Sequence, residues 1–272
     1  MSYSLLDSGD EQKLEKFGPY TLIRPCAQAI WKPKKSWDKV KVDAVFSREK
    51  ENKWKMMNKL PPSWIIELQG VKFKIAPTDF GHLGVFPEHS MLWAWMQEKI
   101  KTRQTPNILN LFAYSGGATL SCAQAGAKVC HLDASKGMVT WARENAELNK
   151  LQSAPIRWIV EDVLKFLQRE QKRNVKYDGI ILDPPSFGRG NKGEIFKIEK
   201  DIHPLLHACK SLLSNDPLFL VLTSHTPGFT PLAMDHLLSQ CLHKGKVETG
   251  EMVISSAESF ALPSGSFAKW EP

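Results

Sequence analysis

The sequence has few cysteines and no long hydrophobic run. Its five cysteines are scattered through 272 residues and none forms a Cys-x-x-Cys pair, which argues against a disulfide framework and a zinc site. The apolar run at residues 218–222 is far shorter than the roughly 18–20 residues that a membrane-spanning helix needs. The first residues are polar and acidic, unlike a signal peptide. We therefore expect a reduced, cytoplasmic protein that has no membrane partner.

The sequence also lacks internal repeats, and its positive charge is concentrated in one segment. The net charge is +7, and residues 31–60 hold ten basic against four acidic residues, which leaves +6 there. Trp31, Trp37 and Trp54 are interleaved with these charges. Such a segment can bind RNA, with its cations on phosphates and its indoles on bases. It can equally be a solvated face whose tryptophans anchor a small sheet.

Residues 1–80 have the pattern of short strands and turns. Residues 20–23 and 27–31 are rich in strand-forming side chains. Residues 63–68 and 71–75 flank a glycine-containing turn, which is typical of a β-hairpin. We therefore expect a small β-rich N-terminal module over residues 1–80, on the substrate side of the protein.

From about residue 106 the pattern changes to alternating strands and helices. Five apolar runs predict strands, and segments with helical spacing follow the first four. The fourth run is almost wholly apolar, as expected for a buried parallel strand. This order predicts an α/β domain over residues 81–272, with a Rossmann-like, doubly wound parallel sheet. The strands are expected at 108–112, 128–132, 157–160, 177–182 and 218–223, the helices at 118–125, 138–149, 162–171 and 203–213, and two closing strands at 247–255 and 265–270.

Doubly wound sheets bind ligands beyond the carboxyl ends of their strands. The first strand leads into Gly116 and Gly117, which allow a tight turn and a close ligand, although the pattern is not Gly-x-Gly-x-x-Gly. Asp133 ends the second strand about twenty residues later, where an acid can bind both hydroxyls of a ribose. Asp162 follows the third strand and can bind an adenine amino group. Each acid can instead be a helix N-cap, a role that Ser135 can take in place of Asp133.

The fourth strand ends in the most specific pattern, Asp183 followed by Pro184 and Pro185. Prolines donate no backbone hydrogen bond, so their rigid turn presents carbonyl groups beside the carboxylate. Such a surface suits a target amino group or base edge, and Phe187 can stack on a ring. We therefore interpret Asp183, Pro184, Pro185 and Phe187 as catalytic candidates, against the alternative of a plain strand-ending turn.

Together these motifs resemble the class I S-adenosylmethionine-dependent methyltransferases. More closely, they resemble the RlmI/RlmK-like group that methylates large-subunit ribosomal RNA. The resemblance covers residues 81–226, and residues 262–270 look like the closing strands of that fold. It is carried by GVFPEH at 84–89, NLFAYSGGATL at 110–120, LDAS at 132–135, WARENAELNKL at 141–151, EDVLKFL at 161–167 and LDPPSF at 182–187.

The resemblance implies S-adenosylmethionine as the cofactor. It implies that Asp133 holds the ribose and Asp162 the adenine amine, while Asp183 and Pro184 face the methyl group and the nucleophile. It implies no metal, because the sulfonium already activates the methyl group. Besides Asp133, Asp162 and Asp183, the implied cofactor-binding residues are Phe112, Tyr114, Ser115 and Gly116 at the methionine part, Ala134 and Ser135 at the adenine, and Ala118 and Thr119 in the same glycine-containing motif.

The sequence also bears on the substrate. Members of the resembled family that methylate carbon 5 of cytosine carry a cysteine after the fifth strand, where this chain has Ser224 and His225. We therefore expect a nitrogen target. Ser224 and His225 can contact the substrate or be ordinary polar surface. The RNA-binding PUA domain of the group has no recognisable counterpart, so the candidates for contact with RNA are residues 31–60 and, after the Pro-Pro motif, Arg189 and Lys192.

The sequence therefore predicts an S-adenosylmethionine-dependent methyltransferase that acts on RNA, in particular ribosomal RNA, at a nitrogen. Three alternatives stay open. The first is a methyltransferase of a protein or a small molecule. The second is an NAD-dependent oxidoreductase, which shares the sheet and the ribose-binding acid but is disfavoured by the glycine turn and the Pro-Pro motif. The third is a non-catalytic RNA-binding protein on the same scaffold.

Overall fold

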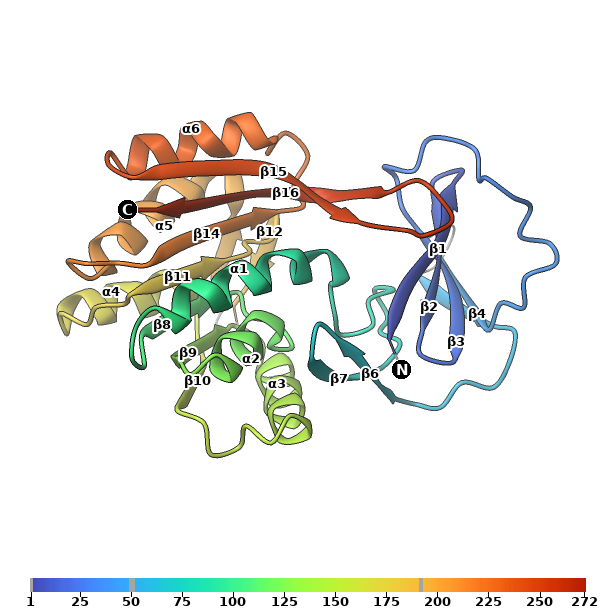
Figure 1. Cartoon of the computed structure of the whole chain (residues 1–272), viewed down its shortest axis with the longest axis horizontal. Helices are drawn as coiled ribbons and strands as arrows, with labels where there is room; N and C mark the ends of the chain where they lie inside the picture. The colour runs from blue at the N-terminus through green and yellow to red at the C-terminus, as the bar shows by residue number, and fades with distance from the viewer. Residues whose placement is uncertain (1, 49–51, 191–192) are drawn as a thin grey trace. The chain divides into compact units, whose positions relative to one another are not determined.

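The alternating pattern after residue 106 forms one sheet in the computed structural model, which describes residues 2–48, 52–190 and 193–272. Its strand order is β10-β9-β8-β11-β14-β16-β15 (Figure 1). The first five of these strands pair in parallel, and β16 pairs antiparallel with β14. The predicted α/β fold is thus confirmed. The strands are β8 (Asn107–Leu111), β9 (Lys128–Asp133), β10 (Ile156–Val160), β11 (Gly179–Leu182), β14 (Phe219–Ser224), β15 (Lys246–Ile254) and β16 (Leu262–Glu271).

Helices cover both faces of this sheet. On one face, α4, α5 and α6 bury a cluster with alternate residues of the strands, among them Leu109 and Leu111 of β8. On the other face, Thr119 of α2 bonds Asn110 and His131 of the sheet. None of the helices in the described ranges is long and apolar enough to cross a bilayer. The helices are α1 (Ser90–Lys101), α2 (Gly117–Gln124), α3 (Lys136–Leu148), α4 (Val163–Lys172), α5 (Ile198–Leu212) and α6 (Pro231–Cys241), and η1 (Pro87–His89) is a short 3-10 turn.

The N-terminal residues form two smaller sheets. A five-stranded sheet has the order β1-β2-β3-β4-β5, and β6 and β7 form the predicted hairpin. The predicted strand at residues 27–31 is wrong, because this segment instead accepts hydrogen bonds from the turn between β1 and β2, at Ala29 and Trp31. The strands are β1 (Tyr3–Gly9), β2 (Gln12–Phe17), β3 (Tyr20–Pro25), β4 (Ala44–Ser47), β5 (Lys53–Met56), β6 (Trp64–Leu68) and β7 (Val71–Ile75).

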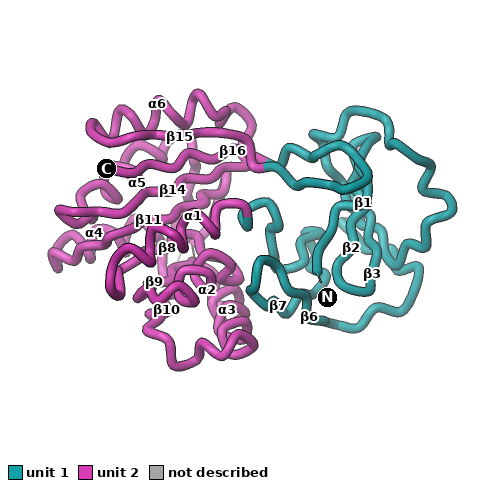
Figure 2. Tube along the Cα trace, viewed as in Figure 1, with its two compact units in different colours: residues 1–90, 253–264 teal, residues 91–252, 265–272 magenta. Residues whose placement is uncertain are grey.

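The chain divides into two compact units (Figure 2). Unit 1 comprises Met1–Ser90 and Val253–Ser264, and unit 2 comprises Met91–Met252 and Gly265–Pro272. The end of the β15–β16 hairpin therefore belongs to unit 1. The functional division at residue 80 stays a prediction, and the compact units are divided at other positions.

Candidate active site

The carboxyl ends of the parallel strands carry the predicted site residues of unit 2. The loop after β8 contains Phe112–Gly116, β9 ends at Asp133, and Asp162 follows β10. Asp183 follows β11, and His225 follows β14. Because these strands run in parallel, the residues after them lie along one edge of the sheet.

The loop after β8 has an unusual backbone. Phe112 and Tyr114 have φ angles of 55° and 49°, in the left-handed region that non-glycine residues rarely adopt. Gly116 has a φ of 96°, and a Cβ there would lie 3.1 Å from the Cβ of Ala142 in α3. Strained residues of this kind persist only where their surroundings impose them, and they cluster at binding and catalytic sites. The loop therefore has a fixed, strained backbone of the kind found at binding sites.

Two buried hydrogen bonds hold this loop in place. The amide of Asn145 in α3 donates to the carbonyl oxygen of Ser115 at 3.0 Å. The backbone N–H of Ala113 donates to the carbonyl oxygen of Leu132 in β9 at 3.0 Å. The conformation of the loop is thus coupled to its neighbouring helix and strand. Sequence analysis missed Asn145, although a buried asparagine in an otherwise apolar helix face was a possible signal.

Asp133 is half-buried at the end of β9, and each of its oxygens accepts a backbone hydrogen bond. Tyr114 N–H donates to Oδ2 at 2.9 Å, and Ser135 N–H donates to Oδ1 at 2.8 Å. Burial raises the pKa of Asp133, and the two hydrogen bonds lower it in part. The Ser135 hydroxyl accepts from Met138 N–H and caps α3, so Asp133 is not the cap of that helix. The remaining lone pairs of Asp133 can accept hydrogen bonds from a ligand's hydroxyls.

Asp162 does cap a helix. Its Oδ1 accepts from the backbone N–H of Lys165 at 3.0 Å, at the start of α4. The alternative role of Asp162, as a helix N-cap, is therefore confirmed. It uses one of the two carboxylate oxygens, so binding of an adenine amine by Asp162 stays a prediction.

Beneath the loop lies a polar network that the sequence did not predict. The Thr119 hydroxyl accepts from Asn110 Nδ2 and lies 2.9 Å from His131 Nδ1. All three side chains are buried, and burial lowers the pKa of His131 to about 3, with a further contribution from the Arg143 charge. Burial thus favours the neutral imidazole, to which the Thr119 hydroxyl can donate its own proton while it accepts from Asn110. Because the Thr119 side chain is engaged here, only its backbone is left to meet a cofactor.

Asp183 is held from a neighbouring strand. The Thr223 hydroxyl of β14 donates to Asp183 Oδ1 at 2.7 Å, and Thr223 is 3% exposed. The next residue, Pro184, is buried, whereas Pro185 is exposed. Further along, the hydroxyls of Ser186 and Thr226 are hydrogen-bonded at 2.7 Å. The strand-ending carboxylate is thus oriented by Thr223, and the bond of Ser186 to Thr226 links the segments that follow β11 and β14.

The residues after the Pro-Pro motif form a small hairpin of β12 (Phe187–Arg189) and β13 (Ile195–Lys197). Phe187 is half-exposed, and the Arg189 guanidinium lies 5.8 Å from its ring centroid. Phe196 of β13 packs on Phe112, with ring centroids 5.2 Å apart. The hairpin therefore packs against the loop after β8 and leaves Phe187 and Arg189 accessible. Lys192 lies outside the described residues.

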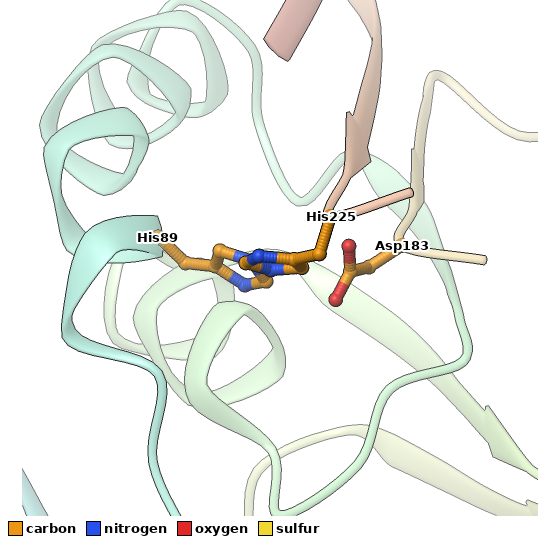
Figure 3. A group of neighbouring side chains, drawn as sticks. All are labelled: His89, Asp183 and His225. Carbon is orange, nitrogen blue, oxygen red and sulfur yellow. The ribbon is translucent and has the colours of Figure 1, made fainter. Parts of the chain in front are cut away.

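One further side chain stands beside Asp183. His225 is exposed, and one of its ring nitrogens lies within 4.8 Å of a carboxylate oxygen of Asp183 (Figure 3). Figure 3 also draws His89, which belongs to unit 1. The pair of Asp183 and His225 combines a hydrogen-bond acceptor with a group that can take up a proton.

The basic segment 31–60 is described except for residues 49–51, which include Lys50. Its tryptophans are anchors within unit 1. The indole N–H groups of Trp31, Trp37 and Trp54 donate to Ser8 O, Asp7 Oδ2 and Thr78 O at 2.8–2.9 Å. Most of its lysines are exposed. The segment therefore presents cations rather than free indoles.

Comparison with known proteins identifies the family of this chain. The family model of S-adenosylmethionine-dependent methyltransferases matches residues 39–239. The ribosomal RNA large subunit methyltransferase K/L of Pseudoalteromonas translucida (strain TAC 125) is 32% identical over 181 residues, which cover 66% of this chain and 25% of that protein. The protein of that name from Shewanella frigidimarina is 32% identical over 165 residues, 60% of this chain and 22% of its own. The chain thus spans a quarter or less of the length of these relatives.

Two solved structures are also similar. A SAM dependent methyltransferase from Agrobacterium tumefaciens is 39% identical, with a TM-score of 0.95, and the match covers 100% of this chain and 91% of that chain. The structure of SMU.776 complexed with SAH has a TM-score of 0.77 at 19% identity and covers 99% of this chain and 75% of that chain. The second likeness is one of fold.

Proposed function

The chain belongs to the S-adenosylmethionine-dependent methyltransferase family, and we propose that it methylates ribosomal RNA at a nitrogen atom. The observation that carries this proposal is the edge of the sheet in unit 2. A preformed loop, the acceptor Asp133 and the fixed carboxylate of Asp183 all follow the carboxyl ends of parallel strands there. Family membership also excludes the nicotinamide-dependent alternative.

The donor and acceptor groups at this edge fit the cofactor. Both oxygens of Asp133 are oriented by backbone N–H groups and retain lone pairs, which suits the two hydroxyl donors of a ribose. The loop at Phe112, Tyr114 and Gly116 exposes backbone in a fixed conformation, which suits the polar methionine end. When bound, S-adenosylmethionine supplies a methyl group that its sulfonium already activates.

The role of Asp183 is then to align the target nitrogen with the methyl group. Because Thr223 donates to Oδ1, the carboxylate is held as an acceptor for a hydrogen bond from a target amino group. Such a bond directs the nitrogen lone pair along the axis of transfer, and orientation of this kind is the main contribution that the protein must make. Phe187, exposed on the β12–β13 hairpin, can stack on the target base.

A nitrogen target is favoured over carbon 5 of cytosine by the state of the cysteines. All five are buried, and none lies in residues 225–230, the segment between β14 and α6. Burial raises the pKa of Cys122 to about 12 and also raises that of Cys209 in α5. The reactive form of a cysteine nucleophile is the thiolate, which burial of this kind suppresses.

RNA as substrate is favoured by the relatives named as ribosomal RNA large subunit methyltransferases and by the positive charge of residues 31–60. The exposed lysines of the basic segment can contact phosphates, and Arg189 beside Phe187 offers a cation at the site. We also propose a cytoplasmic location, which a ribosomal RNA substrate and five free cysteines support.

The test is transfer of labelled methyl groups from S-adenosylmethionine to RNA and protein fractions of cells that lack this protein. We expect label in RNA and, after digestion to nucleosides, in an N-methylated base. Label in 5-methylcytosine would contradict the nitrogen target, and label only in the protein fraction would contradict RNA as substrate. Label at background while RNA still binds would favour a non-catalytic role. For Asp183→Ala we expect retained cofactor binding and lost transfer.

A further inference from the structure

The His225 side chain has a defined position at the edge of the sheet. It follows Ser224, the last residue of β14, and faces the backbone of β16 at Gly265. Gly265 has a φ of 115°, and a Cβ there would lie 3.1 Å from His225 Nδ1 and 2.7 Å from the Ser224 carbonyl oxygen. A larger residue at this position would displace the ring. The position of the imidazole therefore depends on a glycine in the neighbouring strand.

The residues on either side of His225 are fixed as well. Ser224 and Thr226 are both buried, and Thr226 N–H donates to Ser224 Oγ at 3.1 Å. The Thr226 hydroxyl is bonded to Ser186, which lies in the loop that follows Asp183. His225 is thus an exposed side chain on a segment that is tied down at both ends.

The ring lies near the candidate catalytic carboxylate. A ring nitrogen of His225 lies within 4.8 Å of a carboxylate oxygen of Asp183, a separation that one water molecule can bridge (Figure 3). Asp183 and His225 both belong to unit 2, and Figure 3 also draws the imidazole of His89 from unit 1. Asp183 is oriented by Thr223, whereas His225 is open to solvent.

We propose that His225 accepts the proton that the target nitrogen loses on methylation and releases it to solvent. This inference rests on the proposed function, since only a nitrogen that carries hydrogen has such a proton to lose. The nitrogen–carbon bond forms as the carbon–sulfur bond breaks, and the sulfur keeps that electron pair as a neutral thioether. The nitrogen then carries one positive charge and one proton in excess. The proton passes to the imidazole beside Asp183, directly or through one water, and from there to bulk water.

The experiment compares His225→Asn and His225→Ala with the wild type, using labelled S-adenosylmethionine and total RNA from cells that lack this protein. We expect transfer by both variants to fall by about 10²-fold, the lower range for loss of a general base. The dependence of the rate on pH should flatten on its acidic side. Added imidazole should restore transfer to His225→Ala but not to His225→Asn, because only the alanine leaves room for it. Cofactor affinity, measured calorimetrically, should stay at the wild-type value.

His207→Asn is the matched control, since His207 is an exposed histidine of α5 and the same change there should alter nothing. Wild-type transfer rates in His225→Asn, with no effect of imidazole on His225→Ala, would overturn the inference and leave the proposed function standing. If the wild type labels protein instead of RNA, the proposed substrate fails, and the same variants are then compared on that protein. Loss of wild-type activity with EDTA, restored by a divalent metal, would assign the pair to metal binding and overturn the inference.

Discussion

The amide of Asn145 donates a hydrogen bond to the carbonyl oxygen of Ser115 across 3.0 Å, between residues thirty positions apart. Asn145 is fully buried in the last turn of α3, and Ser115 lies in the strained loop after β8. A buried polar group in a helix that otherwise packs through Val139 and Ala142 has a specific purpose. Here it stabilises the left-handed backbone against relaxation.

Asn145→Ala should therefore weaken both fold and cofactor binding. Loss of a buried hydrogen bond costs about 1–3 kcal/mol of unfolding free energy, which denaturant titration measures. Calorimetry should show weaker binding of S-adenosylmethionine. Asn149→Ala is the control, since Asn149 follows the end of the same helix and its amide donates to the Asn145 carbonyl. An equal loss of affinity in both variants would contradict this role of Asn145.

Asp133→Asn tests the predicted ribose acid. The substitution keeps the size of the side chain but presents an NH2 group to one of the two backbone donors, Tyr114 N–H or Ser135 N–H. It also removes the charge that strengthens hydrogen bonds to ribose. We expect cofactor affinity to fall by about 10–100-fold, equivalent to about 1.5–3 kcal/mol for a charged hydrogen bond. Unchanged affinity in a calorimetric titration would remove Asp133 from the cofactor site.

Thr223→Val should separate binding from chemistry. Valine fills the same buried space but cannot donate to Asp183 Oδ1. We expect cofactor affinity to be retained and labelled methyl transfer to fall by roughly tenfold, the equivalent of one charge-assisted hydrogen bond. Thr140→Val, at an exposed hydroxyl that bonds only within α3, is the matched control. Full transfer by Thr223→Val would show that Asp183 needs no support from β14.

Alanine substitutions at two glycines can separate the cost of a left-handed backbone from the cost of a steric clash. Gly116 and Gly126 have φ angles of 96° and 97°, but only at Gly116 would a Cβ meet a neighbour, Ala142 at 3.1 Å. Alanine at either position should cost about 1–2 kcal/mol for the left-handed backbone. Gly116→Ala should lose more stability and also cofactor affinity, as denaturant and calorimetric titrations can measure. Equal effects at both positions would show that Ala142 adjusts freely.

The buried His131 predicts a dependence of stability on pH. Its pKa is about 3 in the folded chain, against about 6.5 when unfolded. Between these values the unfolded chain binds the additional proton, so this stability is fully present above about pH 6.5 and is lost as the pH falls towards 3. His131→Gln should make the pH dependence of unfolding shallower over this window. His207→Gln, at an exposed site, should leave it unchanged.

The strand ends could be predicted because the chemistry there is local. Asp133 and Asp183 each stop a compact apolar run, and parallel strands bring such positions to one edge. The sheet followed from the same runs, since a strand buried on both faces is apolar at most positions. The role of Ser135 as a cap could likewise be foreseen from its place before a helix.

Other features depend on tertiary structure. β1 and β2 carry polar side chains at most positions, and their pairing is decided by neighbouring strands rather than by an apolar pattern. The Thr119 hydroxyl looked available in a glycine-rich loop, but the sheet buries it against Asn110 and His131. The three tryptophans of the basic segment are bonded to distant backbone and carboxylate groups that no local spacing indicates.

The discontinuity of unit 1 has a consequence for synthesis on the ribosome. Its small core joins Leu5, Cys26 and Ala29 to Ile254 and Leu262 of the late hairpin, and Ser259 there is hydrogen-bonded to Asp7. Translation proceeds at about 5–20 residues per second, so the first 90 residues wait on the order of ten seconds for the hairpin. Until then the nascent N-terminal sheet presents an unfinished apolar surface. Its maturation therefore requires nearly complete synthesis of the intervening chain.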